Sequence, residues 1–132
     1  MPAPTPFAAL FDEKYVLLTT FRKTGVGVPT AVWAAGEGDT LFVTTVATAG
    51  KVKRIRNNPD VTLQPCTMSG RIKGDATPVA ARAEILDDTE GLVEGSAALE
   101  AKYGWQFRMA FRAERRGGAG ASSRVILKIS AA

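Results

Sequence analysis

The chain contains no histidine, and it has a single cysteine, Cys66, among its 132 residues. The absence of histidine excludes a histidine general base, a Ser-His-Asp triad and any metal site built on imidazole. A single cysteine excludes an internal disulfide and a zinc site made of cysteines, and it has no histidine to activate it as a nucleophile. If the chain is an enzyme, we therefore expect a bound cofactor to carry the reactive chemistry.

Long apolar runs and a strong net charge are also missing. No apolar run approaches the ~20 residues that span a membrane, and the first residues, MPAPTPFAAL, lack the charged leader and apolar run of a signal peptide. We therefore expect a cytoplasmic protein with no membrane contact. The formal charge of +4 suits anionic small molecules as well as polynucleotides. Since no nucleic-acid-binding module is recognisable, we expect no nucleic-acid partner.

The length favours a single domain over residues 1–132, with residues 1–12 as an N-terminal arm or short helix. Runs rich in β-branched and aromatic residues predict six strands, at residues 15–21, 29–35, 40–45, 61–68, 78–86 and 124–130. Helical patterns cover residues 51–57, 90–103 and 105–115, and residues 117–121 form a connecting loop. Either Asp87 or Asp88 is placed to cap the second of these helices. Hairpins without a βαβ rhythm favour a mostly β protein, a small antiparallel barrel with a few short helices.

The most informative segment lies between residues 41 and 61. An apolar strand ends in two hydroxyls, Thr44 and Thr45, and a short link leads to a basic helical turn with Lys51, Lys53, Arg54 and Arg56. Hydroxyls at a strand end that face cations at a helix start predict a cradle for a phosphate group. The alternatives are that the threonines are ordinary strand residues and that the basic turn is a solvated helix face.

Helical geometry divides the basic residues into two pairs. Val52 and Ile55 are spaced to form the buried side of this helix. Lys51 and Arg54 lie on one edge of this buried side, and Lys53 and Arg56 lie on the opposite edge. One phosphate cannot easily reach both edges. We therefore expect Lys51 and Arg54 to hold it, because a lysine point charge and a bidentate arginine suit phosphate.

The order of motifs along residues 15–129 resembles a known family. The motifs are PTAVW, GEGD, LFVTT, GKVKRIRNNPDV, LQPC, RIKG and KYGWQFR. Together they resemble the pyridoxamine-phosphate-oxidase-like proteins, and most closely the branch of small actinobacterial oxidoreductases that use the deazaflavin coenzyme F420, the flavin/deazaflavin oxidoreductase B type. The resemblance implies a six-stranded antiparallel split β-barrel of the FMN-binding type. It also implies a homodimer with the cofactor in a groove at the interface.

Several site residues follow from this resemblance. Thr44, with Thr45 beside it, matches the family's strand-end hydroxyl, and Lys51 matches its phosphate-binding lysine. Lys53 or Arg56 would then meet the acidic tail of the cofactor or face solvent. The strand expected beside the deazaflavin ring carries Pro29, Thr30, Ala31 and Val32.

The implied activity is hydride transfer between coenzyme F420 and an unidentified small organic substrate, such as an activated double bond. FMN-using relatives tend to carry an FYTN-like strand end followed by Ser-Arg-Lys. Here the strand end is FVTT with no Ser-Arg-Lys, which disfavours FMN. An FMN flavoprotein and a non-catalytic F420 carrier are the alternatives. We expect Trp33 and Trp105 to be core or interface residues, with Trp105 placed to line the groove of a second subunit.

Overall fold

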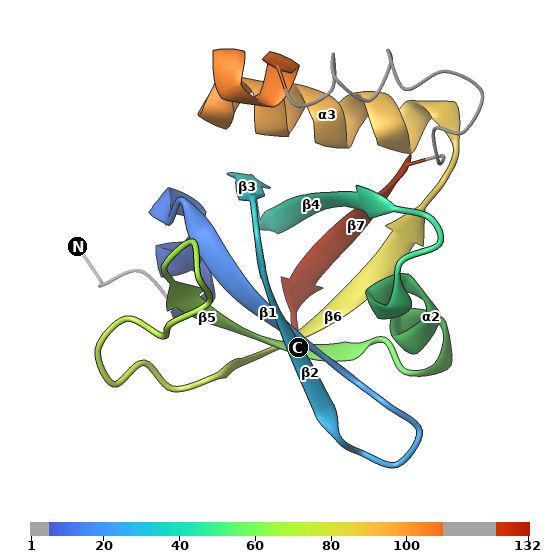
Figure 1. Cartoon of the computed structure of the whole chain (residues 1–132). Coiled ribbons are helices and arrows are strands. Elements are labelled where there is room, and N and C mark those ends of the chain that lie inside the picture. The colour runs from blue at the N-terminus through green and yellow to red at the C-terminus, as the bar shows by residue number, and fades with distance from the viewer. Residues whose placement is uncertain (1–5, 110–123) are drawn as a thin grey trace.

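The computed structural model describes residues 6–109 and 124–132. A strongly curled antiparallel sheet forms the body of the protein, and the helices pack around it (Figure 1). The strands are β1 (Tyr15–Phe21), β2 (Gly27–Val32), β3 (Ala34–Glu37), β4 (Thr40–Val46), β5 (Asp60–Cys66), β6 (Val79–Leu86) and β7 (Arg124–Ala131). The helices are α1 (Pro6–Ala9), the 3-10 turn η1 (Leu10–Asp12), α2 (Gly50–Asn57) and α3 (Thr89–Tyr103). The predicted mostly β fold is confirmed.

Strand order explains how the sheet closes. The order is β2-β1-β5-β6-β7-β4-β3, so β2 and β3 lie at its two ends although only Trp33 separates them in the chain. At this residue the chain leaves its pairing with β1, where Val32 is opposite Val16, and begins pairing with β4, where Ala34 is opposite Val43. The prediction of one strand over residues 29–35, and hence of six strands, was wrong because this change of partner divides the segment in two.

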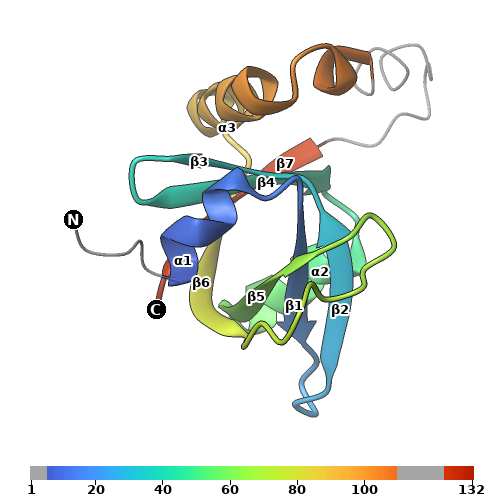
Figure 2. The same ribbon diagram turned by 90° about the vertical axis from the view of Figure 1, so that its left-hand side faces the viewer.

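Two apolar cores lie on opposite faces of the sheet. Side chains alternate between the faces along each strand. In β4, Leu41 and Val43 point into the barrel interior with Leu18 and Leu63 of other strands. Phe42 points outward into a second core beneath α3. The outer faces of β3, β4 and β7 are therefore apolar, and α3 covers them in both views (Figures 1 and 2).

Helix α3 has well-defined ends. The Asp88 side chain caps its start by accepting a hydrogen bond from the Gly91 amide at 2.9 Å. Gly104 follows its last residue with a φ of 59°, a conformation that favours glycine. The predicted helix over residues 90–103 is confirmed, and residues 105–109 continue in helical form. The rest of the predicted helix over 105–115, the predicted loop over 117–121 and residues 1–5 of the predicted arm lie outside the described residues.

Helix α2 joins β4 to β5 and lies beside β1 and β6 (Figure 1). Val52 and Ile55 are 1% and 3% exposed, so the predicted buried side of this helix is confirmed. The helix ends at Asn57, two residues before Pro59, as expected for a residue that cannot continue a helix. Within the described part of the chain, no helix is long and apolar enough to cross a membrane.

Candidate anion-binding site

The start of α2 is open to an anionic ligand. Its N-cap residue, Ala49, offers no side-chain cap, and the first turn carries no acidic residue. The amides of Val52 and Lys53 donate to the Ala49 carbonyl at 3.1 and 3.4 Å, whereas those of Gly50 and Lys51 at the helix start have no such partner among the described residues. The start of a helix carries a partial positive charge, and its free amides bind anions.

Lys51 adds a half-buried ammonium group at this position. Its Nζ donates to Oγ1 of Thr45 at 3.4 Å. Burial lowers the pKa of Lys51, and the positive charges of Arg54 and Arg124 lower it further. A cation held among other cations at the positive end of a helix is unfavourable on its own, and an anion would relieve the repulsion.

Arg54 reaches the same region from one turn further along α2. Its Nε donates to Oγ1 of Thr20 at 2.6 Å, and Thr20 is only 1% exposed. Among residues 6–109 and 124–132, neither Lys51 nor Arg54 belongs to an ion pair, because the pairs found there join Lys73 to Glu13, Arg82 to Asp60 and Arg108 to Glu100. Two cations thus meet hydroxyls rather than carboxylates, which leaves their charge uncompensated.

Strand alternation explains which hydroxyls reach the site. Thr20 and Thr45 continue the inward-facing rows of β1 and β4 to the end of the barrel that α2 covers. Thr44, the residue that we expected to be the main hydroxyl, alternates to the other face of β4, the same face as Phe42. The structure therefore brings Thr45, and not Thr44, to Lys51.

The remaining cations of α2 lie elsewhere. Lys53 and Arg56 are both exposed, on the edge of the helix opposite to Lys51 and Arg54, as helical geometry predicts. Sequence reasoning missed Thr20 and Arg124, which join the site from β1 and β7. Arg124 pairs with Val46 across the sheet. In the sequence, Arg124 is marked only as the first residue of a predicted strand. The pairing of β7 with β4 is what brings it near Lys51.

Strand β2 runs away from this cluster along the edge of the sheet. Its register places Val28 opposite Thr20 and Thr30 opposite Leu18. Pro29 is exposed, Thr30 and Ala31 are half-buried, and Val32 belongs to the inner core. No strand pairs with the outer edge of β2 within the described residues, so the backbone groups on that edge have no partner strand there.

The bend between β2 and β3 is held by α3. Tyr103 accepts a hydrogen bond from the Ala34 amide at 2.9 Å, and its hydroxyl lies 2.7 Å from the Lys14 carbonyl. Lys102 donates to the carbonyls of Glu13 and Ala34. The Tyr103 ring stacks on Trp33 with centroids 4.6 Å apart. Trp33 is half-buried and packs against the second core, and these contacts fix the bend between β2 and β3.

The hydroxyl of Tyr103 is unsuited to proton transfer at neutral pH. Burial raises the pKa of Tyr103 to about 12. Burial lowers the pKa of Lys102, which nearby Asp12 and Glu13 partly offset. Both side chains bond to backbone groups of other elements, so their observed role is to join α3 to the barrel.

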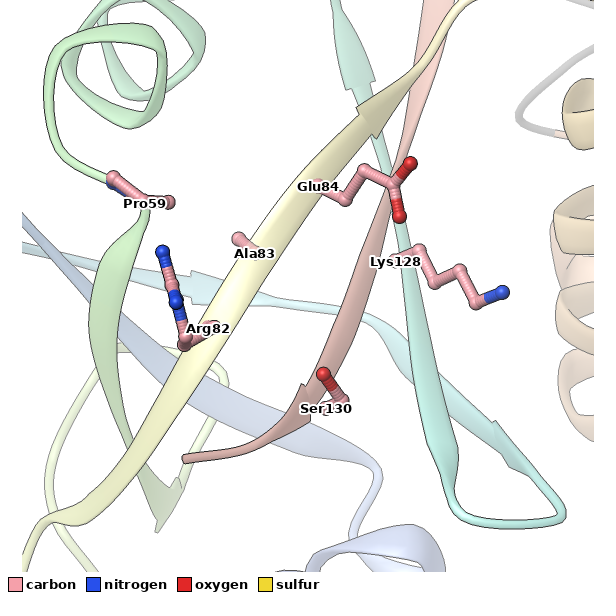
Figure 3. Close-up of a pocket in the computed structure, with 6 residues that line it drawn as sticks. All are labelled: Pro59, Arg82, Ala83, Glu84, Lys128 and Ser130. Carbon is pink, nitrogen blue, oxygen red and sulfur yellow. The ribbon is translucent and has the colours of Figure 1, made fainter.

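A hollow that is separate from the α2 cluster lies on the outer face of β6 and β7 (Figure 3). It has a volume of about 280 Å³ and is lined by Pro59, Arg82, Ala83, Glu84, Lys128 and Ser130. Both signs of charge are mixed along its walls, and Arg82 already lies 3.5 Å from the Asp60 carboxylate. This hollow therefore offers no concentrated charge for an anion.

The cluster at α2 fits a phosphate group by its donor set. It combines an ammonium, a guanidinium, two hydroxyls and two open amides, from Lys51, Arg54, Thr20, Thr45 and the first turn of α2. All of these groups donate hydrogen bonds, and phosphate oxygens only accept them. No carboxylate is among these groups, whereas an ordinary surface ion-pair network contains carboxylates that neutralise its cations.

Known structures share this fold at low sequence identity. A structure titled F420 reductase is 21% identical, with a TM-score of 0.63 over 98% of this chain and 96% of that one. A conserved hypothetical protein from Mycobacterium tuberculosis is 20% identical, with a TM-score of 0.67 over 99% and 81%. The heme storage protein HutZ from Vibrio cholerae is 14% identical, with a TM-score of 0.67 over 94% and 87%.

Sequence comparison gives the family. No curated protein sequence matches the chain significantly. The model of the pyridoxamine 5'-phosphate oxidase family matches residues 7–132, which include every described strand and the whole of the α2 cluster. The chain therefore belongs to the pyridoxamine 5'-phosphate oxidase family, with the split-barrel fold that the resemblance implied.

Proposed function

We propose that the chain is an oxidoreductase that uses the deazaflavin coenzyme F420 to reduce a small organic substrate. The observation that carries this proposal is the cation pair Lys51 and Arg54 at the uncapped start of α2, with no carboxylate partner among the described residues. Family membership makes a phosphate-bearing redox cofactor the expected ligand for such a cluster. The chain lacks histidine, so a cofactor also supplies the reactivity that its side chains do not.

In this proposal the phosphate lies at the helix start. The ammonium of Lys51 and the guanidinium of Arg54 neutralise its charge, while Thr45 and the open amides of the first turn donate to its oxygens. Thr44 keeps a place in the proposal only as a neighbour, since its side chain lies on the other face of β4. Lys53 lies in the first turn on the exposed edge, where it is placed to meet the acidic tail of the cofactor.

The ring of the cofactor would lie along β2. From Val28, opposite Thr20, to Val32 the strand extends about 13 Å at the usual rise per residue. With a phosphate at the Thr20 level, this length accommodates a linking chain and a ring that lies beside the strand residues Pro29, Thr30, Ala31 and Val32. The outer-edge backbone groups of this strand are available to orient the ring, and the core position of Val32 keeps the strand in place.

When bound, the reduced deazaflavin supplies a hydride to an electrophilic carbon of the substrate. The residues of the chain would hold the anionic part, orient the ring and exclude water from one of its faces. No protein acid is required, since a proton can come from solvent. A structure titled F420 reductase shares the fold over nearly the whole chain, which favours this cofactor among those that the family uses.

A second subunit completes the proposed groove. Family members place the cofactor between two barrels, and Trp105, which is 66% exposed, is available to line a groove from the partner copy. Large exposed aromatic side chains are typical of protein and ligand contacts. Cofactor binding should therefore depend on the homodimer, and a monomer that binds fully would contradict this part of the proposal.

FMN is the alternative cofactor for the same cluster, and a carrier role is the alternative function. The carrier alternative is supported by a structural neighbour of this fold, HutZ, which is described as a heme storage protein. Oxidation of reduced F420 by a panel of unsaturated substrates would favour the enzyme. Tight binding without turnover of any of them would favour the carrier.

Substitutions on the two edges of α2 test the proposed phosphate position. Lys51→Met and Arg54→Met should each weaken F420 binding at least about tenfold, the effect of losing one charge-assisted hydrogen bond. Arg56→Met removes the same charge from the last turn of the exposed edge and should change the affinity less than about twofold. Equal, small losses in all three variants would indicate general attraction to a basic helix and would reject the cluster as the phosphate site.

A further inference from the structure

The side chain of Arg54 lies over the first turn of α2, against Gly50. A Cβ placed on Gly50 would be 2.8 Å from one terminal guanidinium nitrogen of Arg54, and 3.6 and 3.7 Å from the central carbon and the other nitrogen. Real Cβ atoms do not approach other heavy atoms to 2.8 Å. The guanidinium therefore occupies space that any other residue at position 50 would fill.

The backbone of Gly50 does not itself require glycine. Its φ is not among the positive values found at Gly25, Gly38, Gly70, Gly74 and Gly104, and it begins a regular helix. Glycine is the poorest helix former after proline, so alanine would be the better residue at this position for the helix alone. The close approach of the Arg54 side chain is a physical reason for glycine here.

The position of the Arg54 guanidinium brings it close to Thr20 and Lys51. Passing over Gly50 lets Nε of Arg54 donate to the buried Thr20 hydroxyl at 2.6 Å. It also keeps the guanidinium close enough to Lys51 to lower the pKa of that side chain. A single anion at the helix start can then contact both cations and the open amides.

We propose that Gly50 is a positioning residue for Arg54, and that its missing side chain determines the anion affinity of the α2 cluster. This inference rests on the proposed function, because it concerns the same phosphate position. A Cβ at residue 50 would displace the flexible end of Arg54 and leave the helix in place. The substitution should therefore weaken anion binding without lowering the stability of the protein.

The test is a double-mutant cycle of wild type, Gly50→Ala, Arg54→Met and the double variant. Each protein is titrated with F420 and with FMN, and its thermal unfolding midpoint is measured. Gly50→Ala should weaken binding of the preferred cofactor about three- to tenfold, as a displaced charge-assisted contact would. Its unfolding midpoint should stay equal or rise, because alanine favours the helix. In the Arg54→Met background, the same glycine substitution should change affinity less than about 1.5-fold.

Each other outcome has a definite meaning. Unchanged affinity in Gly50→Ala, or an equal loss in the Arg54→Met background, would overturn the inference. A fall in the unfolding midpoint or failure to fold would also overturn it, because the glycine would then serve the helix itself. If Arg54→Met alone left both affinities unchanged, the proposed phosphate position would fail. If Arg54→Met weakened binding and Gly50→Ala did not, only the role of Gly50 would be rejected.

Discussion

Replacing Tyr103 with phenylalanine should destabilise the protein substantially, although only one oxygen atom is lost. Ring stacking on Trp33 is retained, but the hydroxyl bonds to the Ala34 amide at 2.9 Å and to the Lys14 carbonyl at 2.7 Å are removed. Ala34 is fully buried, so its amide would lose its partner without access to bulk water. A buried unpaired donor costs about 1–3 kcal/mol, and the second bond adds about 1 kcal/mol, which gives about 2–4 kcal/mol.

This free energy corresponds to a measurable change in thermal stability. For a chain of 132 residues, the usual unfolding entropy per residue converts it to a fall of about 7–14 °C in the unfolding midpoint. Differential scanning calorimetry of the two proteins measures that fall directly. Tyr15→Phe is the matched control, because the hydroxyl of half-buried Tyr15 has no hydrogen bond in the described part of the chain. The control should stay within about 2 °C of wild type.

The two midpoints decide whether the Tyr103 hydroxyl joins α3 to the barrel. A fall of less than about 2 °C in Tyr103→Phe would refute the reasoning, because the Ala34 amide would then have another partner or little need of one. A similar fall in Tyr15→Phe would also refute it. In that case the loss would reflect the removal of any tyrosine hydroxyl and not the loss of the bonds at the bend.

Three further predictions concern the titration of Tyr103 and Lys51 and the packing of Gly95. Since the pKa of Tyr103 is raised to about 12 from 10.0, folding favours its protonated form, and urea unfolding should show stability lost between about pH 10 and 12 in wild type relative to Tyr103→Phe. The pKa of Lys51 is lowered in the free protein and an anion should raise it, so calorimetric titration should show cofactor affinity falling as pH rises toward 10, and less so in Lys51→Arg. Gly95→Ala should destabilise by about 1–3 kcal/mol in urea unfolding, because its Cβ would lie 2.6 Å from buried Ile126, whereas an exposed helical glycine would be stabilised by alanine.

Local patterns predicted the elements well. The strand expected over residues 15–21 has the same bounds as β1, and the helix expected over 51–57 differs from α2 by one residue. Each of these segments carries its own periodicity and its own end signal, such as Pro59 after α2. The buried side of α2 was predictable for the same reason, since Val52 and Ile55 are three residues apart.

Features that depend on distant parts of the chain were not predictable in this way. The break at Trp33 arises because β2 pairs with β1 and β3 pairs with β4, and neither partner is encoded in residues 29–35. Tyr103 binds backbone groups of Lys14 and Ala34, which leave no mark in the sequence.

The candidate site shows the same division between local and distant information. Lys51 and Arg54 were predictable because they share an edge of one helix. The hydroxyls depend on strand orientation, and the alternation of β4 selects Thr45 over Thr44. Thr20 and Arg124 enter from strands that are far from α2 in sequence. A local motif can thus indicate a candidate anion site, while the fold decides which distant residues lie beside it.

The most direct test of the account is a pair of equilibrium titrations of the purified protein, one with coenzyme F420 and one with FMN, followed by fluorescence. The account predicts micromolar or tighter binding of F420 and much weaker binding of FMN. Preference for FMN would contradict the deazaflavin assignment and make Lys51 and Arg54 ligands of the FMN phosphate. Binding of neither cofactor would contradict the proposed function itself.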